Sequence, residues 1–63
     1  MKSKEELMQM LFNRLAELQD GRIKKLYPTL AERYVHELAL LYGILGDDVP
    51  EEYWDAIETE IDD

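Results

Sequence analysis

Apolar residues recur at intervals of three and four along most of this chain, and that spacing constrains its fold more than any other feature. Leu7, Leu11 and Leu15 show the pattern near the amino terminus. At 100° per residue such positions form one stripe on an α-helix, whereas a half-buried strand needs strict alternation of apolar and polar residues. No alternating stretch is long enough for a strand. The sequence therefore predicts an all-α fold.

Capping motifs mark where the helices begin. Ser3-Lys4-Glu5-Glu6 and Thr29-Leu30-Ala31-Glu32 both have the form of a capping box. In this motif a serine or threonine hydroxyl accepts a hydrogen bond from the backbone N–H three residues on, and the glutamate carboxylate accepts one from the N–H of the capping residue. We expect a first helix over residues 4–20 and a second over residues 29–45.

Glycine and proline mark the breaks between the helices. Gly21 and Gly46 are expected just past the ends of the first two, and Pro28 disfavours helical geometry in the residue before it. A third helix over about residues 50–61 should be capped by Asp48 or Val49 and carry Pro50 in its first turn. Whether the first helix continues past Gly21 is left open by the pattern.

The helix over residues 29–45 is apolar on two sides. One broad face is expected in the core, while Leu40 and Ile44 project from nearly the opposite side. A helix of this kind is normally packed between neighbours. The sequence predicts a compact three-helix bundle, a single domain over residues 1–63, with this helix at its centre.

Small size limits how such a bundle can be stabilised. A chain of 63 residues without cysteine has no disulfides and must rely on apolar packing, on a partner, or on both.

The amino terminus turns acidic before any apolar signal region could form, and no apolar run approaches the ~20 residues of a membrane span. We expect a cytoplasmic protein with no membrane partner.

Catalysis and metal binding find little support in the residue types. His36-Glu37 begins a zinc-protease motif, but that motif requires a second histidine at position 40, which is Leu40. The chain has one histidine, no cysteine, and a single serine already assigned to a cap. These residues offer no nucleophile, base and orienting group together. We predict no enzyme activity, no catalytic residues, no metal site and no cofactor.

Charge is distributed unevenly along the chain. Residues 1–33 hold seven bases and five acids, for a net charge of +2, whereas residues 34–63 hold ten acids and no base, for a net charge of −10. The expected acidic surface consists of Asp47, Asp48, Glu51, Glu52, Asp55, Glu58 and Asp62. Carboxylates along a rigid helix could imitate nucleic-acid phosphates and attract a basic partner. Solubility is the simpler explanation of the same residues.

Two further groups of residues are candidates for binding. The apolar patch, Met10, Leu40 and Ile44, is expected outside the three-helix core, with Leu30 as a fourth candidate. Such patches often mark interfaces, either between two copies or with a foreign helix. The basic connector, Arg22, Lys24 and Lys25, is the one place where nucleic acid could bind, or it could pair with the acidic helix.

These features favour a small acidic protein-binding module, acting as an inhibitor, adaptor or regulator on a partner with a basic surface. It would dock through the apolar patch and the acidic carboxy-terminal helix. In size and charge the chain resembles small acidic helical inhibitors carried by phages and mobile elements. The alternatives are a homodimeric nucleic-acid-binding regulator that uses the basic connector and a structural subunit of a larger assembly. Direct nucleic-acid binding is disfavoured by the net charge of −8.

Overall fold

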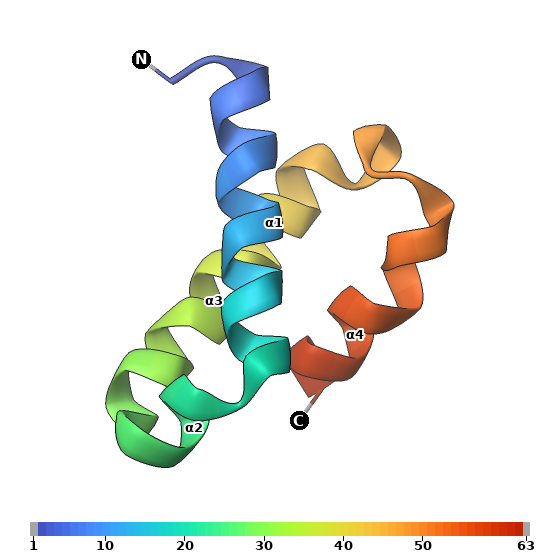
Figure 1. Cartoon of the computed structure of the whole chain (residues 1–63). Coiled ribbons are helices and arrows are strands. Elements are labelled where there is room, and N and C mark those ends of the chain that lie inside the picture. The colour runs from blue at the N-terminus through green and yellow to red at the C-terminus, as the bar shows by residue number, and fades with distance from the viewer. Residues whose placement is uncertain (1, 63) are drawn as a thin grey trace.

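Four α-helices and two short 3-10 turns make up the computed structural model of the chain, which describes residues 2–62 (Figure 1). The helices are α1 (Lys4–Asp20), α2 (Arg22–Leu26), α3 (Pro28–Leu45) and α4 (Trp54–Asp62), and the turns are η1 (Gly46–Asp48) and η2 (Glu51–Tyr53). The all-α prediction is confirmed, since the described part of the chain contains no strand. The three-helix bundle is confirmed only in part, because the expected connector is itself helical.

The first helix has the predicted bounds. The backbone N–H of Glu6 donates to Ser3 Oγ over 3.2 Å, which is the first half of the capping box. Gly21 ends the helix with φ 81° and ψ −12°. This left-handed conformation is costly for a residue with a Cβ atom, so glycine allows α1 to stop and α2 to start within one residue.

The second capping box is not formed, and the prediction that it opens the helix was wrong. α3 begins at Pro28, and no side-chain hydrogen bond caps it at Tyr27. Proline has a fixed φ suited to the first helical position and lacks the N–H that would need a partner there. The helix therefore starts one residue early and places Thr29 inside its first turn. Tyr27 itself is non-helical, at φ −137° and ψ 69°, as expected for a residue before proline.

The segment between α3 and α4 also differs from the prediction. Neither Asp48 nor Val49 caps α4; Val49 is buried, and its carbonyl accepts a hydrogen bond from Trp54 Nε1 over 2.9 Å. Pro50 is extended and precedes η2, in which the N–H of Tyr53 donates to the carbonyl of Pro50 over 3.0 Å. The chain thus makes a 3-10 turn before the regular α-helix starts at Trp54.

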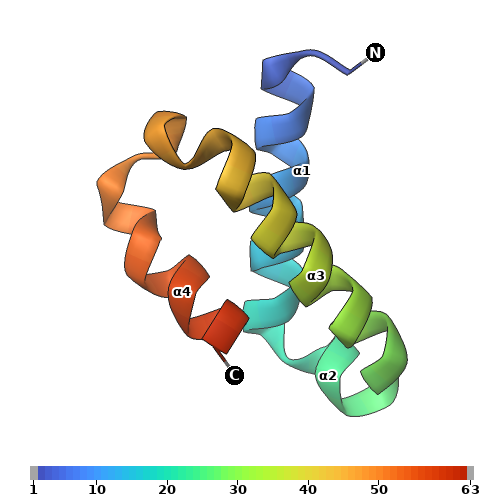
Figure 2. The same ribbon diagram turned by 180° about the vertical axis from the view of Figure 1, so that it is seen from behind.

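α3 is the central element, as predicted: it packs against α1, α2 and α4. Figure 2 shows it passing in front of α1 with α4 beside it. Among residues 2–62, nine apolar side chains are buried, contributed mainly by α1 and α3: Leu11, Leu15, Leu18, Ala31, Leu38, Leu41, Leu45, Val49 and Ile57. The molecule measures 30 × 26 × 15 Å, so it is thin in one direction and the outer side of α3 is left uncovered.

Candidate interaction surfaces

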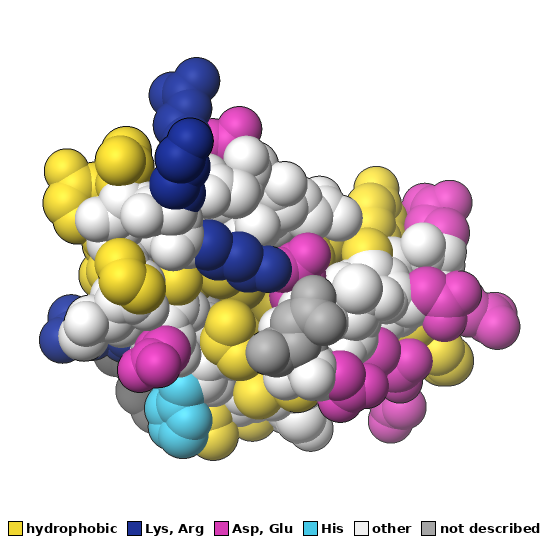
Figure 3. All heavy atoms as spheres, turned by 90° about the horizontal axis from the view of Figure 1, so that it is seen from below, with side chains coloured by type: hydrophobic (Ala, Val, Ile, Leu, Met, Phe, Trp, Pro, Cys, Tyr) yellow, Lys and Arg dark blue, Asp and Glu magenta, His cyan; other side chains and the backbone are white. Residues whose placement is uncertain are grey.

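The acidic surface is exposed along its whole length. All seven of its carboxylates, on η1, η2 and α4, are solvent-exposed. Asp55, Glu58 and Asp62 are three and four residues apart, so they share one face of α4. At a rise of 1.5 Å per residue their positions lie about 4.5 and 6 Å apart along the helix axis. Figure 3 shows acidic side chains gathered on the right, the side of the molecule that carries α4 in Figure 1.

Apolar contacts hold this surface in place. Ile57 is fully buried on the inner side of α4, and Trp54 and Ile61 pack partly against the core. Tyr53 is exposed, but its ring meets Phe12 of α1 edge-on with the centroids 4.9 Å apart. The acidic segment is therefore a fixed part of the fold rather than a loose tail.

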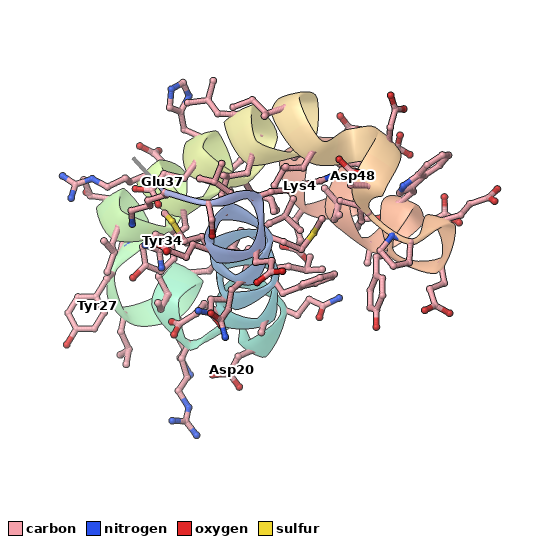
Figure 4. The ribbon with its side chains drawn as sticks, turned by 90° about the horizontal axis from the view of Figure 1, so that it is seen from above. Lys4, Asp20, Tyr27, Tyr34, Glu37 and Asp48 are labelled. Atoms are coloured by element: carbon pink, nitrogen blue, oxygen red, sulfur yellow. The ribbon has the colours of Figure 1, made fainter. Side chains whose placement is uncertain are left out.

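Most of the acidic surface forms no ion pair with the described residues. Among residues 2–62, only Asp48 of this set forms an ion pair, at 2.9 Å from Lys4 Nζ. Figure 4 shows these two side chains pointing toward each other. Glu60, on another side of α4, is paired with Lys24 at 2.6 Å and is only 12% exposed. The six remaining carboxylates of the acidic surface are left facing solvent.

Tyr42 of α3 lies beside the acidic stripe, which is the face of α4 that carries Asp55, Glu58 and Asp62. The pKa of its hydroxyl is raised above the ordinary tyrosine value, first by partial burial and then by the negative charge of Glu58, which also accepts its hydrogen bond. Asp55 contributes to the pKa in the same direction. Both carboxylates repel the negative charge that the phenol oxygen acquires on deprotonation, so the pKa of Tyr42 reports the local negative potential of α4.

The basic connector is less free than its sequence indicates. Lys24 is bound to Glu60, and Arg22 Nε lies 3.5 Å from Asp20 Oδ2. The first of these contacts is the pairing with the acidic helix that the sequence left open as an alternative. Lys25 is exposed and has no ion pair among the described residues. The connector therefore presents about one uncompensated positive charge instead of three.

The apolar patch is partly as predicted. Leu40 is 56% and Ile44 70% exposed on the outer side of α3. Met10 was expected outside the core, and this was wrong in part: its side chain is partly buried and packs against the core cluster. Its long, flexible side chain can bend under a neighbour, which the helical pattern alone does not show.

Arg14 of α1 fixes the edge of α3 next to this patch. Its Nε donates to Glu37 Oε2 over 2.7 Å, and its guanidinium lies 4.3 Å from the ring centroid of Tyr34.

Tyr42 and Ile44 are two positions apart on α3, which is a rotation of about 200° around the helix axis. Because Tyr42 faces α4, Ile44 points away from it, and the apolar patch and the acidic stripe lie on different sides of α3.

Sequence reasoning missed a second exposed apolar site. Leu26 is 63% and Tyr27 61% exposed where α2 meets α3, and Figure 4 shows Tyr27 projecting away from the body of the molecule. A five-residue helix is too short for its periodicity to be recognised, so this segment was expected only as a connector. The exposed bases Lys25 and Arg33 belong to the same corner of the fold.

The described residues contain no cluster of side chains suited to a metal ion. Within residues 2–62, no three or more histidine, aspartate or glutamate side chains are placed to hold a metal ion. A hollow between α1 and α2 is lined mostly by surface side chains such as Asn13, Glu17 and Asp20. No helix in this part of the chain is long and apolar enough to cross a membrane.

Comparison with models of known protein families, with proteins of described function and with solved structures finds no match.

Proposed function

We propose that this protein is a non-enzymatic binding module, an inhibitor, adaptor or regulator, that docks on a cytoplasmic partner protein with a basic surface. The observation that supports this most is the set of six acidic side chains without ion pairs on the rigid η1–η2–α4 segment. Complementary charge accelerates the encounter with a partner and determines orientation. A stripe of evenly spaced carboxylates on a fixed helix can occupy a site built for phosphates.

Rigidity distinguishes this role from simple solubilisation. Acidic residues that serve only solubility need no defined spacing, whereas Ile57 and the Trp54–Val49 hydrogen bond hold α4 in one position. A carboxylate surface that is ordered before binding loses little conformational entropy when it docks. The exposed Leu40 and Ile44 lie on the other side of α3 and leave the acidic surface free for the partner.

The nucleic-acid alternative has weaker support. Two of the three bases of the basic connector lie beside carboxylates of the same chain, and phosphate binding would have to compete with those contacts. The acidic surface would also repel the nucleic acid. A structural subunit remains compatible with the exposed apolar residues, but no contact in the fold favours it.

Charge reversal tests the proposal. Lysine at positions Glu51, Glu52, Asp55 and Glu58 should abolish capture of the basic partner from a host lysate while circular dichroism shows unchanged helicity. A matched pair of variants controls for net charge: Asp55→Lys/Glu58→Lys against Glu17→Lys/Glu32→Lys, all four being exposed positions. Only the first pair should weaken capture. Equal capture by the two double variants, or capture by the fourfold variant as strong as that by the wild-type chain, would contradict docking through the acidic surface.

A further inference from the structure

The outer side of α3 carries a regular pattern of charge and apolar side chains. Arg33, Leu40 and Asp47 follow one another at intervals of seven residues. Within α3 seven residues are about two turns, so Arg33 and Leu40 lie on nearly one line. Asp47 comes two residues after the end of α3, on η1, where the chain turns at Leu45 with φ −107° and ψ 4°. Ile44 lies between Leu40 and Asp47 in the sequence. A base therefore precedes the exposed apolar residues and an acid follows them.

Gly43 adds an independent observation on the same side. It lies inside α3, where glycine costs about 1 kcal/mol relative to alanine. A Cβ atom at this position would meet nothing within 4 Å, so the fold of the single chain gives no reason for glycine there. Glycine does allow another backbone to approach closely. The outer side of α3 thus has the form of a helix-packing surface that is vacant in the single chain.

We propose that a second copy of this chain occupies this surface, with the two α3 helices packed antiparallel about a two-fold axis near Leu40. In this arrangement Arg33 lies opposite Asp47 of the second copy, because each is seven residues from the centre, and the contact occurs twice. Leu40 and Ile44 from both copies form the apolar middle. A two-fold interface must be complementary to itself, and a base and an acid equidistant from an apolar centre satisfy that requirement.

Charge favours a second copy in this orientation. Antiparallel packing brings Arg33, the base near the amino end of one α3, toward Asp47 just past the carboxyl end of the other, whereas parallel packing would bring each of these charges to its own copy. The stripe on α4 faces away, because Tyr42, which contacts it, lies on the opposite side of α3 from Ile44. The dimer would present two acidic surfaces, and its formation does not depend on their function.

The oligomeric state of the full chain in solution is the test, measured by sedimentation over a range of concentrations. We expect reversible dimers. Ile44→Glu should raise the dissociation constant at least about tenfold, because it places a charge in the apolar centre. Ala16→Glu, an exposed substitution on α1, is the matched control and should leave dimerisation unchanged. A chain that is monomeric at every concentration, or a dimer that Ile44→Glu leaves intact, overturns the proposal.

A charge swap tests the antiparallel arrangement. Arg33→Asp and Asp47→Arg should each weaken the dimer, and the double variant should restore it, because the two residues meet only across the interface. Double substitution without recovery overturns this arrangement. Fourfold lysine substitution of Glu51, Glu52, Asp55 and Glu58 separates this inference from the proposed function: it should abolish partner capture and preserve the dimer.

Discussion

The basic connector and the acidic surface are held to the fold in different ways. α2 contributes no buried residue, and Lys24 fastens it to α4 through Glu60. The acidic segment is anchored by the fully buried Ile57 and keeps most of its carboxylates without partners. Two of the three bases in the connector are thus paired with carboxylates of the same chain, whereas most carboxylates of the acidic surface form no ion pair and can contact a partner. A charge count from sequence treats the two alike, and only the contacts separate them.

The largest expected effect concerns the anchor of the acidic segment. Ile57→Ala should lower the free energy of unfolding by about 2–5 kcal/mol, because it removes fully buried methyl and methylene groups and leaves a cavity. Ile23→Ala in α2 is the control, since its side chain is only partly buried. Its loss should be about 1 kcal/mol. Urea unfolding measures both, and equal losses would show that the two segments are anchored alike.

The next effect concerns the link between the two regions. Lys24→Met should cost about 1–3 kcal/mol, since it leaves the 12% exposed Glu60 carboxylate without its partner. The Arg22–Asp20 pair has both side chains exposed, so Arg22→Met should cost less than about 0.5 kcal/mol. Adding Glu60→Gln to Lys24→Met should recover part of the loss. Similar losses for the two single variants, measured by thermal unfolding, would mean that Lys24 does not hold α2 against α4.

A smaller effect is expected at the turn that leads into α4. Trp54→Phe removes the donor to the Val49 carbonyl while keeping an aromatic ring, and should cost about 1 kcal/mol. Tyr53→Phe keeps the edge contact with Phe12 and serves as the control, with little change in stability. If both variants unfold at the wild-type urea concentration, the hydrogen bond does not stabilise the turn.

The sequence predicted helices well where periodicity and glycine acted together, and poorly where proline decided the start. Six apolar positions and Gly21 defined α1 to the residue. Pro28 and Pro50 both suited more than one conformation: the first became the first residue of a helix and the second stayed extended before a 3-10 turn. Which conformation forms at Pro50 depends on side-chain contacts such as that of Trp54 Nε1 with the Val49 carbonyl, which the apolar pattern does not show.

The sequence also predicted some features of the candidate surfaces and missed others. Exposure of the acidic residues, and of Leu40 and Ile44, followed from their positions on helices. Exposure of Leu26 and Tyr27 did not, because it depends on how the short α2 leaves α1 and meets α3. Pairing of Lys24 with Glu60 joins residues far apart in the chain, and local spacing carries no information about it. Helical periodicity therefore predicts which face a residue occupies, but not what meets that face.

The smallest effect probes the acidic surface without altering the fold. Because the pKa of Tyr42 is raised in the folded state, the group contributes stability that is fully present below the unfolded tyrosine pKa of about 10 and is lost as pH rises through the folded value. Glu58→Gln removes a negative charge and should lower the pKa of Tyr42. Absorbance of tyrosinate, assigned with Tyr42→Phe, measures the change, and Glu17→Gln is a distant control that should leave it unmoved. An unchanged Tyr42 titration in Glu58→Gln would mean that partial burial and Asp55 account for the raised pKa, and that Glu58 exerts no local potential on its neighbour.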